Sequence, residues 1–196
     1  MQLLSNNKNT AANLSPRQVL ENKYKNSSHN ILLVLIFSVI NIFLLVTNSD
    51  TYFLFSAYIP YALADIGMML SGAYTEDVYA ALELTGMEFL GKGFLATMLA
   101  IAAVILVLYL LSWIFAKKNR VGWMIFALVF FALDTAFMLW DVGISMDFIV
   151  DYVFHAWVII SLAMGISAGS KLKKLPPEPE APVAEAAPAE EPQPEE

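Results

Sequence analysis

Residues 93–116 read GFLATMLAIAAVILVLYLLSWIFA, an uninterrupted run of 24 uncharged residues between Lys92 and Lys117. The hydrocarbon core of a bilayer is about 30 Å thick, so a helix that crosses it needs roughly 20 predominantly apolar residues. The run is long enough and apolar enough to meet this requirement. It therefore predicts a membrane-spanning helix and favours a membrane protein over a soluble one.

Three further segments have the same character. Residues 30–48 carry no charge, residues 121–140 are interrupted only by Asp134, and residues 152–170 contain His155 as their only ionisable group besides a tyrosine. Of all residues, 58% are hydrophobic and 15% are charged, whereas soluble domains have about 45–50% and about 25%. The sequence thus predicts an all-α membrane protein with four transmembrane helices.

The basic residues indicate the orientation, because Lys and Arg near the ends of spans stay on the cytoplasmic side. With four spans and a cytoplasmic N-terminus, ten of the eleven basic residues fall inside and only Lys92 falls outside. Those ten are Lys8, Arg17, Lys23, Lys25, Lys117, Lys118, Arg120, Lys171, Lys173 and Lys174. We therefore predict a multi-pass protein of the cell membrane with both termini in the cytoplasm.

Residues 51–70, TYFLFSAYIPYALADIGMML, are a candidate for a fifth span. The segment is long enough, but it contains Pro60, Asp65 and three tyrosines. A fifth span at this place would move six of the ten cytoplasmic basic residues to the outside. We therefore predict an interfacial or re-entrant helix within an external loop of residues 49–92.

Two end segments flank the four-helix domain of residues 29–170. In the leader, residues 1–28, the sequence SPRQ at 15–18 has the pattern of a capping box and predicts a short helix to about Tyr24. Residues 171–196 are rich in Pro, Ala and Glu, with seven Glu after three lysines. Such a composition buries too little apolar surface to fold, so we predict a disordered cytoplasmic tail.

Asp134 is the most informative residue, because a carboxylate within a span costs about 2.5–3.5 kcal/mol and has to face protein or water. Asp141 lies nearly on the same helix face, and Asp151 and His155 share a face of the last span. A short loop joins the two spans, so the geometry allows the four residues to form an outward-opening cluster. Structural pairing, ion or proton handling, and metal ligation are the three roles considered, and no metal is assigned because the spacing lacks a tight metal motif. Asn41, in the first span, is expected to form a hydrogen bond across helices.

Small residues recur at helical spacing in two spans, where they would let a neighbouring backbone approach closely. Residues 165–169 within one of these stripes also fit the G-x-S-x-G pattern. That pattern marks a nucleophile only at a strand-to-helix turn, so no catalytic residue is assigned. The residues predicted to pack helices are Gly93, Ala96, Ala100 and Ala103 in the second span and Ser161, Gly165 and Gly169 in the fourth.

The remaining sequence features narrow the function without naming it. The chain has no cysteine, which excludes disulfides, thiolate nucleophiles and cysteine-held metals. No P-loop, H-E-x-x-H or dinucleotide motif occurs, and neither a cofactor nor nucleic acid is expected. We expect a non-enzymatic accessory, structural or scaffolding subunit that contacts the lipid bilayer and a membrane-protein partner or a second copy of itself. The alternative is a small cation- or proton-linked transporter or channel component that uses the Asp134, Asp141, Asp151 and His155 cluster, and a membrane enzyme ranks third.

Overall fold

The computed structural model describes residues 14–49 and 51–176, and within these ranges the chain forms helices and no strand. Four of the helices, one of them together with a preceding 3₁₀ turn, are long and apolar enough to span a membrane. The prediction of an all-α fold with four helices of spanning length is confirmed, and these helices indicate a multi-pass membrane protein. In chain order the elements are α2 (Pro16–Val46), α3 (Tyr58–Ser71), α4 (Glu76–Ala81), α5 (Lys92–Lys117), α6 (Val121–Val142), the 3₁₀ turn η1 (Met146–Phe148) and α7 (Ile149–Leu172).

α2 combines the predicted leader helix and the first span in one helix of 31 residues. The predicted capping box is present: Ser15 Oγ accepts a hydrogen bond from the Gln18 N–H at 3.2 Å, and the Ser15 N–H donates to Gln18 Oε1 at 3.0 Å. The expected end of this helix near Tyr24 is wrong. Neither Pro nor Gly follows before the apolar run, so nothing stops the helix from continuing into it.

The end segments are described only in part. α7 continues through Leu172, so the first two residues assigned to the tail still belong to the helix. Lys171 in its last turn is favourable there, because a cation stabilises the negative end of a helix dipole. The prediction of disorder from residue 177 onward falls on residues outside the described ranges. The first 13 residues of the leader also lie outside these ranges.

α5 has the surface of a helix that contacts lipid. In its most apolar stretch of 18 residues, only 11% of the residues are buried inside the protein. The corresponding share is 33% in each of the other three long helices. Val104 and Val107 are among the large apolar side chains that it exposes. Exposed apolar side chains of this kind are suited to contact with lipid tails.

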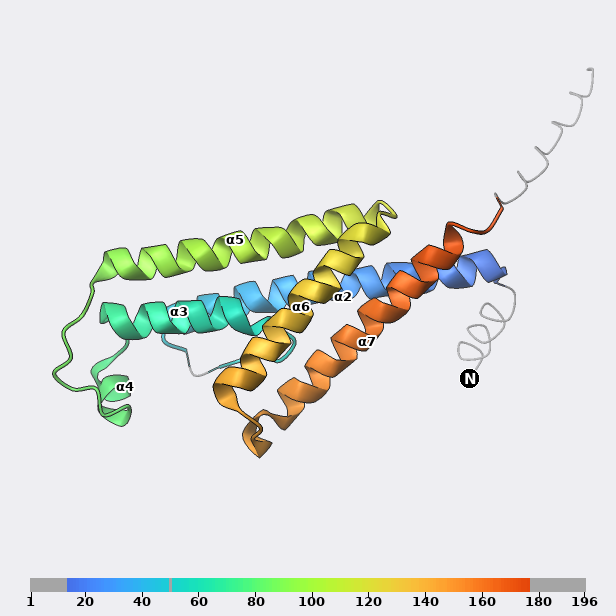
Figure 1. The fold of residues 1–196 in the computed structure, drawn as a ribbon. Helices are drawn as coiled ribbons and strands as arrows, with labels where there is room; N and C mark the ends of the chain where they lie inside the picture. Colours follow the sequence, from blue (N-terminus) through green and yellow to red (C-terminus); the bar gives the residue numbers. More distant parts are fainter. Residues whose placement is uncertain (1–13, 50, 177–196) are drawn as a thin grey trace, which may run out of the picture.

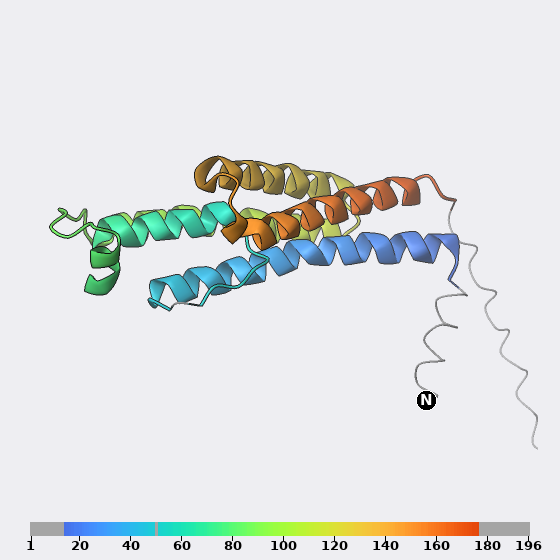
Figure 2. The same cartoon turned by 90° about the horizontal axis from the view of Figure 1, so that it is seen from below.

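The helices form two groups that cross each other. α3 and α5 lie side by side with α2 along them, and α6 and α7 cross this group obliquely (Figure 1). In the view from below, α7 lies along α2 (Figure 2). The main core fills the space between α2, α5, α6 and α7, and its largest fully buried side chains include Tyr24, Ile31, Val34, Tyr109, Met124, Phe131, Val158 and Leu162.

Both described ends of the chain lie at one end of this bundle. Tyr24 Oη donates a hydrogen bond to the Ala116 carbonyl at 2.9 Å, and the Tyr24 ring lies beside Gly169. These contacts bring together the first turns of α2, the α5–α6 turn and the last turns of α7. We call this the termini end, and we call the opposite end, with α4 and the α6–α7 turn, the far end.

After α2 the chain turns back alongside the helix that it has just left. Asn41 forms hydrogen bonds with both backbone groups of Phe53, and Ser38 Oγ accepts one from the Ala57 N–H at 2.8 Å. Residues 53–57 therefore run antiparallel to the last turns of α2. Ser38 lies eight residues before the end of α2, so the chain returns about 12 Å into the bundle at 1.5 Å per residue.

α3 then runs from the interior back toward the far end. Pro60 lies in its first turn, where a missing N–H costs no helical hydrogen bond. The helix ends at Gly72, whose φ of 81° is the left-handed conformation that glycine adopts without strain. A Cβ at this position would also lie 2.8 Å from the Phe89 ring. Residues 51–71, which enter and leave the bundle at the same end, are called the folded-back segment below.

Candidate functional site

Asp134 on α6 binds the backbone of the folded-back segment at the start of α3. Its side chain is buried, its Oδ2 accepts a hydrogen bond from the Tyr58 N–H, and its Oδ1 accepts one from the Ile59 N–H, both at 2.8 Å. The preceding residue, Ala57, has no side-chain acceptor with which to cap α3. A carboxylate from another helix therefore caps α3, and the positive end of the α3 dipole stabilises its negative charge.

His155 on α7 lies directly beside this carboxylate. Its Nε2 is 3.6 Å from Asp134 Oδ2, and both side chains are 3% exposed. The other ring nitrogen, Nδ1, is 2.8 Å from the Asp151 carbonyl oxygen one turn earlier. The imidazole stacks on Phe131, with ring centroids 4.9 Å apart and 13° between the planes. Within the described ranges Nε2 has no hydrogen-bond partner, which is rare for a buried polar atom.

Asn41 and Ser38 on α2 hold the extended part of the folded-back segment. The Asn41 side chain donates to the Phe53 carbonyl at 2.6 Å and to Ser56 Oγ at 2.9 Å, and it accepts from the Phe53 N–H at 2.8 Å. The sequence predicted a hydrogen bond from Asn41 across helices. Its partners belong instead to the non-helical segment, which needs side-chain partners because it lacks helical hydrogen bonds of its own.

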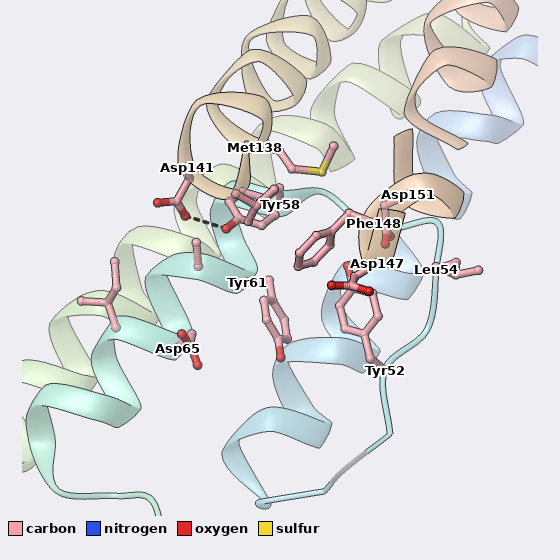
Figure 3. A pocket seen from close by; sticks show the side chains of 13 residues that line it. Tyr52, Leu54, Tyr58, Tyr61, Asp65, Met138, Asp141, Asp147, Phe148 and Asp151 are labelled. Atoms are coloured by element: carbon pink, nitrogen blue, oxygen red, sulfur yellow. Dashed lines mark hydrogen bonds between the residues drawn. The ribbon is translucent and has the colours of Figure 1, made fainter. Parts of the chain in front are cut away.

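A cavity of about 670 Å³ lies at the far end, between the folded-back segment, α6 and the start of α7. Among the described residues, four carboxylates and three tyrosines contribute to its wall, and no Lys, Arg or His does. Figure 3 shows Tyr61 and Phe148 projecting toward its middle. The lining residues are Tyr52, Leu54, Tyr58, Tyr61, Ala62, Asp65, Ile66, Met138, Asp141, Val142, Asp147, Phe148 and Asp151.

Hydrogen bonds fix two of the cavity's carboxylates. Tyr58 Oη donates to Asp141 Oδ2 at 2.6 Å, as the dashed line in Figure 3 marks. Asp65 accepts a hydrogen bond from the Tyr74 hydroxyl. A carboxylate that accepts one such bond keeps lone pairs for a further donor, so both groups can still interact with a ligand.

The tyrosines contribute ring faces and no negative charge. Burial raises the pKa of Tyr52 to about 12, although its hydrogen bond with Ser56 acts in the opposite direction. The ring of Tyr52 packs edge-on against Tyr61 with centroids 5.2 Å apart. A hydroxyl with so high a pKa stays protonated at neutral pH, so the negative charge of the cavity comes from its aspartates.

The carboxylates do not converge on one point. Within the described ranges no group of three or more His, Asp or Glu side chains is arranged to hold a metal ion. Separate carboxylates around an aromatic wall suit a bulky cation better, because such a cation spreads its charge over a surface and also interacts with ring faces. The arrangement gives metal ligation, one of the three roles considered for the cluster, no support.

The predicted polar cluster is divided between two places. Asp134 and His155 form the buried pair, whereas Asp141 and Asp151 line the cavity. The two places are adjacent, because Tyr58 lines the cavity and donates its N–H to Asp134. The cluster predicted from the sequence did not include the tyrosines, Asp65 or Asp147. Residues 58, 61 and 65 lie at helical spacing, so one polar face of α3 was a usable signal once that helix was expected.

The stripes of small residues have different surroundings. On α7, a Cβ at Gly165 would lie 2.7 Å from Met124 Sδ and one at Gly169 would lie 2.7 Å from Val121 Cγ2, so both glycines lie in close contact with neighbouring helices. Ser161 Oγ accepts a hydrogen bond from Asn30 Nδ2 at 2.5 Å. On α5 the stripe of Gly93, Ala96, Ala100 and Ala103 is exposed, and nothing lies within 4 Å of a Cβ built at Gly93. Within the described ranges this second stripe therefore packs against no other helix, and its use as a packing surface stays a prediction.

Comparison with known proteins adds no relative to this description: no model of a protein family, no curated protein and no solved structure matches the chain.

Proposed function

We propose that this chain is a cation-linked membrane protein, a small transporter or channel component, whose cavity opens to the outer side of the cell membrane. The observation that carries the proposal is the cavity of about 670 Å³, to whose wall the described part of the chain contributes four aspartates, three tyrosines and no basic residue. A recess lined by charges of one sign concentrates ions of the opposite sign.

The proposed orientation has both termini in the cytoplasm. It is supported by the positions of the basic residues, since every Lys and Arg in the described ranges except Lys92 lies at the termini end. The cavity and its carboxylates then belong to the outer half. The folded-back segment is proposed to be re-entrant, which fits its position inside the bundle, where irregular backbone is tolerated because protein surrounds it.

The proposed ligand class is a monovalent organic cation with a substituted ammonium group. Such a group gains about 0.5–2 kcal/mol from each ring face that it contacts and does not require converging oxygen ligands. Tyr52, Tyr61 and Phe148 offer the rings, and Asp141 and Asp147 offer the opposite charge. A dehydrated divalent ion would instead need several oxygens within about 2.6 Å.

The test uses radiolabelled choline and the full-length protein in mild detergent. Choline is expected to bind, tetramethylammonium to displace it, and the uncharged isostere 3,3-dimethylbutan-1-ol to leave it bound. Asp147→Asn and Tyr61→Ala are expected to weaken binding by about tenfold each, which corresponds to about 1.4 kcal/mol. Asp77→Asn is the matched control, because Asp77 is an exposed carboxylate at the far end but outside the cavity wall. Equal competition by the isostere, or no choline binding, would contradict the proposal.

Orientation is tested separately in whole cells, because the chain has no cysteine of its own. A cysteine at position 77 is expected to react with a membrane-impermeant thiol reagent, and a cysteine at position 119 is expected to react only after the cells are opened. The reverse pattern would invert the protein and turn the cavity toward the cytoplasm.

The accessory or scaffolding role remains the other prediction. No feature of the described residues favours it over the cation-linked function, and a partner recovered by co-purification would be its first support.

A further inference from the structure

The hydrogen bonding of His155 determines which of its ring nitrogens carries a proton. Nδ1 is 2.8 Å from the carbonyl oxygen of Asp151. A carbonyl oxygen only accepts hydrogen bonds, so Nδ1 has to be the donor. In a neutral imidazole the other nitrogen is then a bare acceptor. Nε2 would consequently point a lone pair at its surroundings.

Those surroundings consist of a carboxylate oxygen, which is an acceptor too. Asp134 Oδ2 lies 3.6 Å from Nε2, and the two side chains are buried together. No donor in the described ranges reaches Nε2. Two buried acceptors that face each other without a hydrogen between them are unfavourable, since both have lost their water and neither has gained a bond. One additional proton removes the conflict.

We propose that Asp134 and His155 form a proton-binding site that holds one proton between Nε2 and Oδ2 at neutral pH. Both oxygens of Asp134 already act as acceptors, one for the Tyr58 N–H and one for the Ile59 N–H. The proton therefore belongs on Nε2, which makes His155 an imidazolium. The ring of Phe131 stacked beside it also favours a cation.

The groups that surround the pair are acidic or uncharged, which suits a cation at His155. α3 contributes the N–H groups and Tyr58, α5 contributes the buried hydroxyl of Tyr109, α6 contributes Asp141, and α7 contributes Asp151. The extended segment contributes Tyr52. In α2 the facing groups are the uncharged Ser38 and Asn41. None of these residues carries a positive charge that could balance the Asp134 carboxylate, so His155 is the cation available to it.

The proton site and the cavity share two residues, which implies that they interact. Tyr58 lines the cavity and donates its N–H to Asp134, and Asp151 lines the cavity and binds His155 through its carbonyl oxygen. A cation in the cavity repels the nearby imidazolium, so its binding should break the Nε2–H bond and pass the proton to solvent. Linkage is reciprocal, so the proton weakens cation binding to the same degree. This coupling rests on the proposed function, whereas the proton site does not.

The proton site is tested by NMR on the detergent-solubilised protein with isotope-labelled histidine. The chain has two histidines, and a His29→Gln variant assigns the signals. At pH 7 both ring nitrogens of His155 are expected to carry a proton, whereas in Asp134→Asn the Nε2 signal should become that of a bare nitrogen. A wild-type His155 with a bare Nε2 would overturn the proposal, and this outcome requires no variant to fold.

The coupling has its own experiment. Tetramethylammonium added to weakly buffered wild-type protein at pH 7 should release protons in proportion to its binding, and His155→Gln should bind the cation without release. Gln can donate a hydrogen bond to Asp134 without a titrating proton, so the variant keeps the capping carboxylate. Cation binding without proton release in the wild type would overturn the coupling alone. Absence of cation binding would refute the proposed function together with the coupling and leave the NMR result valid.

Discussion

The two ends of the bundle are built on different principles. At the termini end, α2 and α7 touch closely: a Cβ at Gly165 would lie 2.7 Å from Ser27 Oγ, and the Ser27 hydroxyl donates to the Ser161 carbonyl at 2.8 Å. Small side chains let the helix backbones approach, so dispersion contacts and short hydrogen bonds stabilise this end. Every polar group named here is paired within the bundle.

At the far end the folded-back segment packs against α2, α5 and α6. Its backbone needs partners that the segment cannot supply, and α2 and α6 provide them through Asn41, Ser38 and Asp134. The result is a buried carboxylate beside His155 and an acidic cavity. The comparison teaches that small side chains bring helix backbones together at the termini end, whereas inserted backbone brings polar side chains and a cavity to the far end.

The largest expected effect is that of removing the charge that anchors the far end. Asp134→Leu leaves the N–H groups of Tyr58 and Ile59 buried without an acceptor and His155 without its partner. The free energy of unfolding should fall by roughly 3–5 kcal/mol, as measured by titrating the protein from mild detergent into SDS. Asp77→Asn, at an exposed position, serves as the control. A loss below about 1 kcal/mol would show that the cap on α3 is dispensable.

A smaller loss is expected from overfilling the termini end. Gly165→Ala puts a methyl group against Ser27 and Met124 and should cost about 1–3 kcal/mol in the same titration. Gly93→Ala adds the same atoms on α5 where nothing lies within 4 Å, and better helix propensity should leave its stability unchanged or raised. Similar values for both variants would remove the distinction between the two stripes.

The smallest expected effect comes from releasing the extended segment at one point. Ser38→Ala deprives the Ala57 N–H of its acceptor and should lower the free energy of unfolding by about 1 kcal/mol. Ser112→Ala is matched in burial, but its hydroxyl donates to Leu108 in the same helix, whose carbonyl also accepts a helical N–H. If the Ser112 variant loses as much as the Ser38 variant, the hydrogen bond to the folded-back segment contributes nothing of its own.

The sequence predicted those features that depend on local composition. The four long helices follow from uninterrupted apolar runs, and the start of α2 follows from the residues at 15–18. The sequence did not predict that α3 begins at Tyr58, because its cap comes from Asp134, which is 76 residues away. Periodicity also cannot tell which stripe packs within the bundle, since exposed and buried stripes can both consist of small residues, and the α5 stripe is exposed whereas the α7 stripe is packed.

For the candidate site, the sequence identified Asp134 and His155 as polar residues within spans that have to face protein or water. It did not predict which of their atoms face each other. The conflict at Nε2 depends on the direction of the Asp151 carbonyl, which only the fold of α7 determines. The cavity likewise depends on the folded-back segment, which brings Tyr52 and Tyr61 next to Asp147 on a distant loop.

The measurement that tests the central claim most directly is the reaction of a cysteine at position 62 in intact cells. Ala62 lines the cavity, and the chain contains no other cysteine. Relative to their rates with free mercaptoethanol, a cationic methanethiosulfonate reagent should react about tenfold faster or more than an anionic one, because the acidic wall concentrates cations. Asp141→Asn together with Asp147→Asn should remove most of this preference. Equal normalised rates, or no reaction until the cells are opened, would contradict an acidic cavity that faces outward.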